Sequence, residues 1–86
     1  MAALKVNING EPWTLRYVQP RSVKGDSGRC DYEKRRISLR NTEQGIERLD
    51  TLFHELFEAR LPDLDHGVKD EMAALFAKAT WWALME

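Results

Sequence analysis

The spacing of apolar residues changes near residue 42, and this change constrains the fold more than any other feature of the 86-residue chain. Before it, apolar residues alternate with polar ones, which is the period of a strand with one buried face. After it, they recur every three or four residues, which is the period of an amphipathic helix. The sequence therefore predicts an α+β fold with strands first and helices after.

Residues 1–40 are predicted to form the strands of this fold. Three runs there have the required alternation, and they cover residues 4–8, 13–17 and 36–40. Asn9-Gly10 separates the first two runs and favours a tight hairpin, because both central residues of a primed turn need positive φ. We expect a three-stranded β-sheet, made of this hairpin and the third strand.

The stretch between the second and third runs, residues 19–32, is predicted to be a long surface loop. Pro20, Gly25 and Gly28 stand there among mostly polar residues, and this composition is typical of irregular structure. Cys30 near its end is the single cysteine of the chain. A structural role is expected for it, because a thiolate zinc site needs further cysteines and a nucleophile needs a histidine base.

Two helices are predicted in the second half, over residues 43–60 and 65–84. The first ends before Pro62, because proline cannot continue the hydrogen-bond ladder, and the second begins at Asp65, a good N-cap. The expected apolar stripe of the second helix consists of Val68, Met72, Leu75, Ala79 and Trp82. Both helices would cover the buried face of the sheet in a single domain spanning residues 1–86.

Charge gives little support for nucleic acid or a membrane as the partner. Thirteen basic and fourteen acidic residues leave a formal net charge of -1, so no global field attracts a polyanion. A basic cluster around the third strand keeps nucleic-acid binding as a minor alternative, and it consists of Arg29, Lys34, Arg35, Arg36 and Arg40. The single cysteine, with no secretory or spanning segment, predicts a cytoplasmic protein.

His54, Glu55 and Glu58 form the most distinctive chemical pattern. Residues four apart share one face of a helix, so His54 and Glu58 can reach one ion. In the H-E-x-x-H motif of metallopeptidases two histidines hold zinc and the intervening glutamate is the general base; Glu58 stands here where the second histidine would be. The alternative is that His54 is a histidine at the border of the core, satisfied by a hydrogen bond, and that Glu55 and Glu58 are solvated charges of the helix with Arg60 nearby.

Glu71 is a second candidate ligand, because its helical projection falls within the expected stripe of the second helix. A buried carboxylate needs a partner. Binding a metal, pairing with Arg60 or Lys78, and lying at the rim of the stripe all satisfy that need. His66, in the first turn of the same helix, is the alternative ligand to Glu71.

In the order and spacing of its motifs the chain resembles small metallopeptidase-like proteins encoded by tailed phages and prophages. The motifs lie at residues 13–15 (Trp-Thr-Leu), 28–31 (Gly-Arg-Cys-Asp), 36–39 (Arg-Ile-Ser-Leu), 49–55 (Leu-Asp-Thr-Leu-Phe-His-Glu) and 73–82, a helix ending in Trp. Together they extend over most of the chain. The resemblance implies a minimal zincin-like fold and a location in the bacterial host cytoplasm.

The resemblance also implies a metal-dependent hydrolase, with a protein or peptide as substrate. His54, Glu58 and Glu71 would hold a divalent metal, with His66 as alternative ligand, and Glu55 would be the catalytic general base. Zinc is the first choice. The extra carboxylate makes the ligand set richer in oxygen, so manganese and iron are alternatives.

A second hypothesis is a non-catalytic interaction module that keeps the zincin frame and binds a protein partner. The replacement of the second histidine by Glu58 motivates this hypothesis. An exposed Trp81 or an edge of the sheet would supply the contact surface. Metal content separates this hypothesis from the hydrolase.

Overall fold

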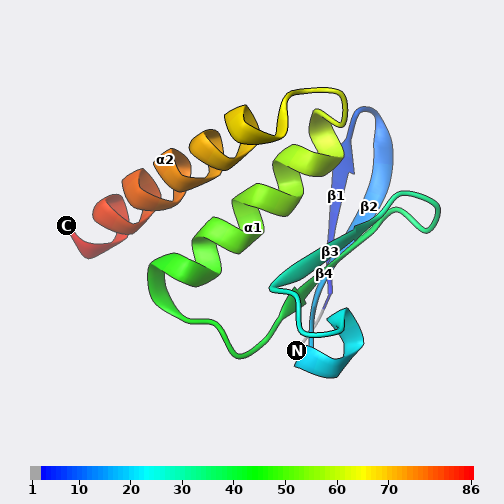
Figure 1. The fold of residues 1–86 in the computed structure, drawn as a ribbon, viewed down its shortest axis with the longest axis horizontal. Coiled ribbons are helices and arrows are strands. Elements are labelled where there is room, and N and C mark those ends of the chain that lie inside the picture. Colours follow the sequence, from blue (N-terminus) through cyan, green and yellow to red (C-terminus); the bar gives the residue numbers. More distant parts are fainter. Residues whose placement is uncertain (1–2) are drawn as a thin grey trace. The chain divides into compact units, whose positions relative to one another are not determined.

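The computed structural model describes residues 3–86 and places strands before helices, as the change in apolar period predicts. The chain divides into two compact units between Thr42 and Glu43. The first unit holds a four-stranded mixed sheet and the second holds two helices (Figure 1). The α+β class is therefore confirmed, while a single domain with helices covering the sheet stays a prediction.

The sheet has the strand order β1-β2-β4-β3. Its strands are β1 (Leu4–Ile8), β2 (Glu11–Val18), β3 (Gly28–Asp31) and β4 (Arg36–Arg40). β2 runs parallel to β4, and the two outer pairs are antiparallel. The β1-β2 hairpin forms at the predicted turn, where Asn9 and Gly10 have φ of 54° and 78°, as a primed turn requires.

The predicted loop at residues 19–32 contains more structure than its composition suggests. Pro20–Val23 form a short 3-10 helix, and Val23 is fully buried. Gly28–Asp31 form β3, which pairs along β4. The prediction of three strands is wrong, because a strand held by backbone pairing needs no alternation of apolar side chains, and this segment has none.

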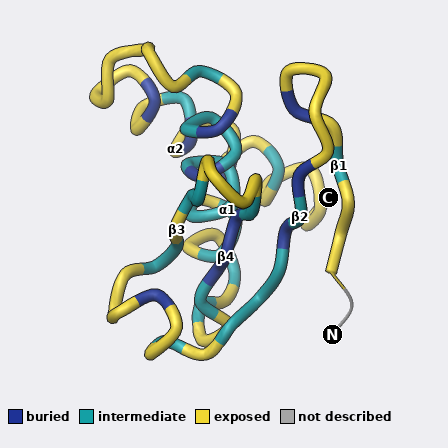
Figure 2. Tube along the Cα trace, turned by 90° about the vertical axis from the view of Figure 1, so that its right-hand side faces the viewer, coloured by how far each residue is buried: buried dark blue, intermediate teal, exposed yellow. Residues whose placement is uncertain are grey.

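One face of the sheet is apolar, because the register aligns the alternating apolar positions of β1, β2 and β4. Leu15 pairs with Ile37 and Tyr17 with Leu39, and the core positions of β2 and β4 are dark blue in Figure 2. On the opposite face, Arg16 Nε donates to Ser38 Oγ at 3.2 Å. The predicted sheet with one apolar face is confirmed.

The helical unit is an antiparallel pair of α1 (Gly45–Arg60) and α2 (His66–Met85) (Figure 1). Its helices lie close to the predicted ranges, and Val68 N donates to Asp65 Oδ2 at 3.3 Å, which confirms the N-cap. Phe53 and Phe57 of α1 pack edge-on against Phe76 of α2. These ring contacts join the middle of the two helices.

The buried side of α2 differs from the predicted stripe. Its buried residues are Lys69, Ala73 and Ala77, and small alanines allow close approach of a neighbouring helix. Val68, Leu75 and Trp82 are instead 43%, 63% and 66% exposed. α2 therefore has two faces with apolar residues, and the predicted buried position of Glu71 is wrong, because Glu71 lies beside the exposed face.

Within residues 3–86, neither helix has the length and apolar composition that a membrane crossing requires.

Candidate metal centre

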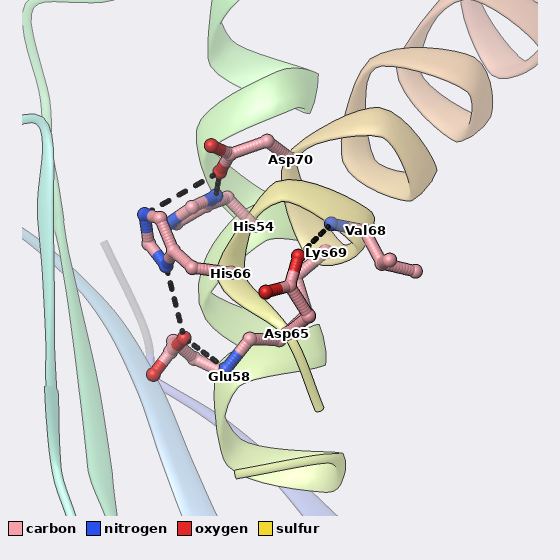
Figure 3. A network of polar contacts seen from close by, with 7 residues as sticks. All are labelled: His54, Glu58, Asp65, His66, Val68, Lys69 and Asp70. Carbon is pink, nitrogen blue, oxygen red and sulfur yellow. Dashed lines mark hydrogen bonds and ion pairs between the residues drawn. The ribbon is translucent and has the colours of Figure 1, made fainter. Parts of the chain in front are cut away.

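Three potential ligands converge where the end of α1 lies beside the start of α2. His54 Nδ1 lies 3.0 Å from Asp70 Oδ1, and His66 Nε2 lies 3.7 Å from the same oxygen. The imidazole rings of His54 and His66 meet edge to face, with centroids 5.4 Å apart. Figure 3 shows all three side chains directed towards one another.

Local helix geometry explains why these residues meet. The Asp65 cap fixes the start of α2, so His66 occupies its first position. Asp70 follows four residues later and therefore lies on the same face of the helix, one turn along. The His54 side chain comes from the facing helix α1. The group therefore links the two helices close to the turn that connects them.

Glu58 lies next to this group rather than within it. Its Oε1 is 3.7 Å from His66 Nδ1, the ring nitrogen that faces away from Asp70. The same oxygen forms an ion pair with Lys69 Nζ, as the dashed lines in Figure 3 show. Glu58 is therefore placed to hold the orientation of the His66 ring, as an outer carboxylate does in many zinc sites.

Lys69 gives Glu58 a further, structural role. The Lys69 side chain is only 3% exposed, whereas that of Glu58 is 25% exposed. An isolated ammonium at such a position is costly, because it loses its hydration without gaining a partner. The Glu58 carboxylate thus neutralises a buried cation within the helical pair.

The donor set fits a divalent metal such as zinc. Two imidazole nitrogens and one carboxylate oxygen are the ligands of several catalytic zinc sites. The candidate ligand atoms of His54, His66 and Asp70 all lie within 4.8 Å of one another, and atoms bound to tetrahedral zinc lie about 3.4 Å apart. Binding of zinc would therefore require the three atoms to move closer together.

Solvent reaches the group from the α2 side. The His66 and Asp70 side chains are 70% and 53% exposed, while that of His54 is 28% exposed. A metal bound by three protein atoms at an open position keeps a coordination site for water. The arrangement is therefore compatible with a reactive site.

The structure brings together some of the predicted site residues. His54 and the alternative ligand His66 belong to the group of three, and Glu58 lies beside it. Within the described residues 3–86, that group includes neither Glu55 nor Glu71. The ligand roles predicted for Glu58 and Glu71 stay predictions.

Asp70 is the member that the sequence interpretation missed. Its spacing of four residues from His66 was the available signal, because it places both side chains on one face of the second helix. The preference for Glu71 depended on a helix rotation that buries it, and that rotation is wrong.

Glu55 occupies a different face of α1 from His54. Neighbouring residues project about 100° apart around a helix, and Glu55 is buried together with Ala59, one turn further on. Glu55 therefore follows His54 directly in the sequence, but its side chain leaves the helix in a different direction. Its predicted role as general base stays a prediction.

Comparison with models of protein families, with curated proteins and with solved structures finds no match to this chain. The function is therefore inferred from the geometry of the site.

Proposed function

We propose that the protein binds one divalent metal ion, with zinc as first choice, through His54, His66 and Asp70. The observation that carries the proposal is the convergence of two imidazoles and a carboxylate on one point, with the candidate ligand atoms within 4.8 Å of one another. Exposed acidic groups are common without a metal ion, whereas two imidazoles with one carboxylate are an established set of zinc ligands. Manganese and iron are the alternatives.

In this proposal Glu58 acts on the metal through His66. Its Oε1 lies 3.7 Å from Nδ1 of the ring, while Nε2 faces Asp70 at the metal position. In the metal-loaded site this oxygen would close to hydrogen-bond distance of Nδ1. A carboxylate on the distal nitrogen fixes the tautomer and raises the basicity of the ligating nitrogen. The position that holds histidine in H-E-x-x-H would thus support a histidine of the next helix.

The proposed activity is metal-dependent hydrolysis, with a protein or peptide as the substrate class. Bound zinc supplies a water of lowered pKa and polarises a carbonyl group. A carboxylate of α1 would accept the proton of the attacking water. The resemblance to the phage-encoded proteins implies Glu55 as this proton acceptor. Glu58 is the second candidate, because its carboxylate lies next to His66 of the proposed metal site.

The first experiment measures metal content and thermal stability of the full chain. Elemental analysis of protein purified without added metal, followed by thermal unfolding with zinc or manganese, is expected to give one ion per chain and a raised Tm. His54→Ala is expected to lose both. Equal metal stoichiometry in His54→Ala would refute the site.

The second experiment assigns the proton acceptor, using a peptide library as substrate. Glu55→Gln that retains zinc but loses hydrolysis would assign the role to Glu55. Unchanged hydrolysis in Glu55→Gln, with loss in a zinc-loaded Glu58→Gln, would assign it to Glu58. Hydrolysis that persists in both variants would contradict a carboxylate base on α1.

A non-catalytic interaction module is the second candidate, and the exposed apolar face of α2 favours it. Leu75 and Trp82 are each more than 60% exposed, and exposed apolar patches mark protein-protein contact sites. A protein with no bound metal and no thermal shift would support the module over the hydrolase.

A further inference from the structure

α2 presents an apolar stripe with the spacing of a coiled-coil seam, and all of its residues except the half-buried Met72 are exposed. The stripe consists of Val68, Met72, Leu75, Ala79 and Trp82. Its members alternate at intervals of four and three residues, so each lies near one line along the helix. These five residues extend from Val68 to Trp82, over 15 of the 20 residues of the helix.

This stripe is turned away from the α1 contact, because Phe76, which packs against Phe53 and Phe57, projects about 100° from Leu75 around the helix. The buried residues Ala73 and Ala77 project about 160° from Leu75 and Val68, at about 100° per residue. The contact with α1 therefore does not cover the stripe, and Leu75 and Trp82 are exposed to solvent. A seam of this kind is normally covered by another helix.

Charges beside the stripe determine which helix fits. Glu71 and Lys78 both lie on one flank, next to Leu75, and they are seven residues apart. In a coiled coil, charges at this flanking position form the pairs that select partner and orientation. The flank carries one charge of each sign, placed almost symmetrically about Leu75.

We propose that the stripe is the interface of a homodimer in which two copies of α2 pack antiparallel about a two-fold axis at Leu75. In a two-fold interface, residue i contacts j' and residue j contacts i'. The axis would place Leu75 against Leu75 of the second copy, Val68 against Trp82, and Glu71 against Lys78.

The distances along the helix support this alignment. At a rise of about 1.5 Å per residue, Val68 and Trp82 lie about 10.5 Å on either side of Leu75. Glu71 and Lys78 lie about 6 Å and 4.5 Å from it. In the antiparallel arrangement Glu71 of each copy therefore lies near Lys78 of the other. The small side chain of Val68 lies opposite the large side chain of Trp82. This inference does not depend on the proposed metal site.

A charge-reversal series, followed by sedimentation equilibrium of the full chain over a range of concentrations, tests the dimer. Glu71→Lys and Lys78→Glu each place like charges across the interface and are expected to raise the dimer dissociation constant at least tenfold. The double reversal restores the unlike pair and is expected to recover the original constant. An equimolar mixture of the two single variants is expected to dimerise as well.

Leu75→Glu provides an independent test with a matched control. Leu75 is exposed in the helical pair, so the variant is expected to fold and to be monomeric. Ala74→Glu adds the same charge to an exposed position of α2 outside the stripe and is expected to remain dimeric. Circular dichroism of both variants monitors folding.

Disulfide crosslinking in a Cys30→Ser background tests the orientation. Leu75→Cys is expected to form a disulfide-linked dimer on oxidation, because the two Leu75 positions face each other. Val68→Cys is expected to form none, since its counterpart in the second copy lies about 20 Å away along the helix. A monomeric wild-type chain, or equal crosslinking at both positions, would overturn the proposal.

Discussion

His54 Nδ1 and Asp70 Oδ1 lie 3.0 Å apart across the pair of helices. This contact joins the motif helix α1 to the first turns of α2, and His66 adds a second imidazole at the same oxygen. The candidate metal site is thus built from both helices, whereas the H-E-x-x-H pattern takes its first two ligands from one.

Zinc is expected to stabilise the protein through Asp70 and not through Glu71. A ligand at about 100 times its Kd adds about 2.7 kcal/mol to the free energy of unfolding, which corresponds to a rise in Tm of about 10 °C or more for a chain of this size. Differential scanning fluorimetry is expected to give this rise for wild type and for Glu71→Gln. Asp70→Asn is expected to lose most of it, and the reverse pattern would restore Glu71 as the third ligand.

Glu58→Gln is expected to weaken zinc binding without abolishing it. The amide lacks the negative charge with which Glu58, 3.7 Å from His66 Nδ1, would orient the ring. Loss of such an outer partner typically costs about 10–100-fold in metal affinity. Competition with a chromophoric chelator measures the change. Complete loss of zinc in Glu58→Gln, as severe as in His54→Ala, would make Glu58 a direct ligand.

The ion pair of Glu58 and Lys69 is expected to respond unequally to removal of its partners. Glu58→Gln leaves the buried Lys69 ammonium without its counter-charge and is expected to lower the free energy of unfolding by roughly 2–3 kcal/mol, less than for a fully buried pair. Lys69→Met removes the buried charge itself and is expected to cost less than about 1 kcal/mol. Urea denaturation of the metal-free protein measures both, with Asp50→Asn as the exposed control. An equal decrease in the free energy of unfolding in the two variants would contradict the expectation that the buried Lys69 ammonium needs Glu58.

Gly10→Ala is expected to destabilise the sheet. Gly10 has φ of +78°, and a side chain there is strained although nothing lies within 4 Å of its added Cβ. The left-handed conformation costs an L-residue roughly 1–2 kcal/mol, and urea denaturation measures it. Ala3→Gly, at an exposed position outside the strands, serves as a control for which no loss above about 0.5 kcal/mol is expected. An unchanged stability in Gly10→Ala would contradict the primed turn.

Local sequence signals predicted the parts of the fold that depend on local physics. The Asn9-Gly10 turn and the Asp65 cap are both confirmed, because each depends on the conformational preference of the residue itself. β3 was missed, since its pairing with β4 uses backbone groups that every residue has.

The candidate site was predicted in part for a related reason. His54 belongs to a recognisable motif, but the residues that join it lie on another helix whose rotation was misjudged. α2 carries apolar residues on two faces, and the pattern favoured the larger side chains of Leu75 and Trp82 over Ala73 and Ala77. With Ala73 and Ala77 on the buried face, the sequence would have predicted an exposed Glu71 and placed Asp70 on the same face as His66.

X-ray absorption spectroscopy of the zinc-loaded full chain tests the central claim most directly, because it counts the imidazoles bound to the metal. We expect two histidine ligands per zinc in wild type, from His54 and His66, and one in His66→Ala. A single imidazole in wild type, unchanged in His66→Ala, would contradict the site.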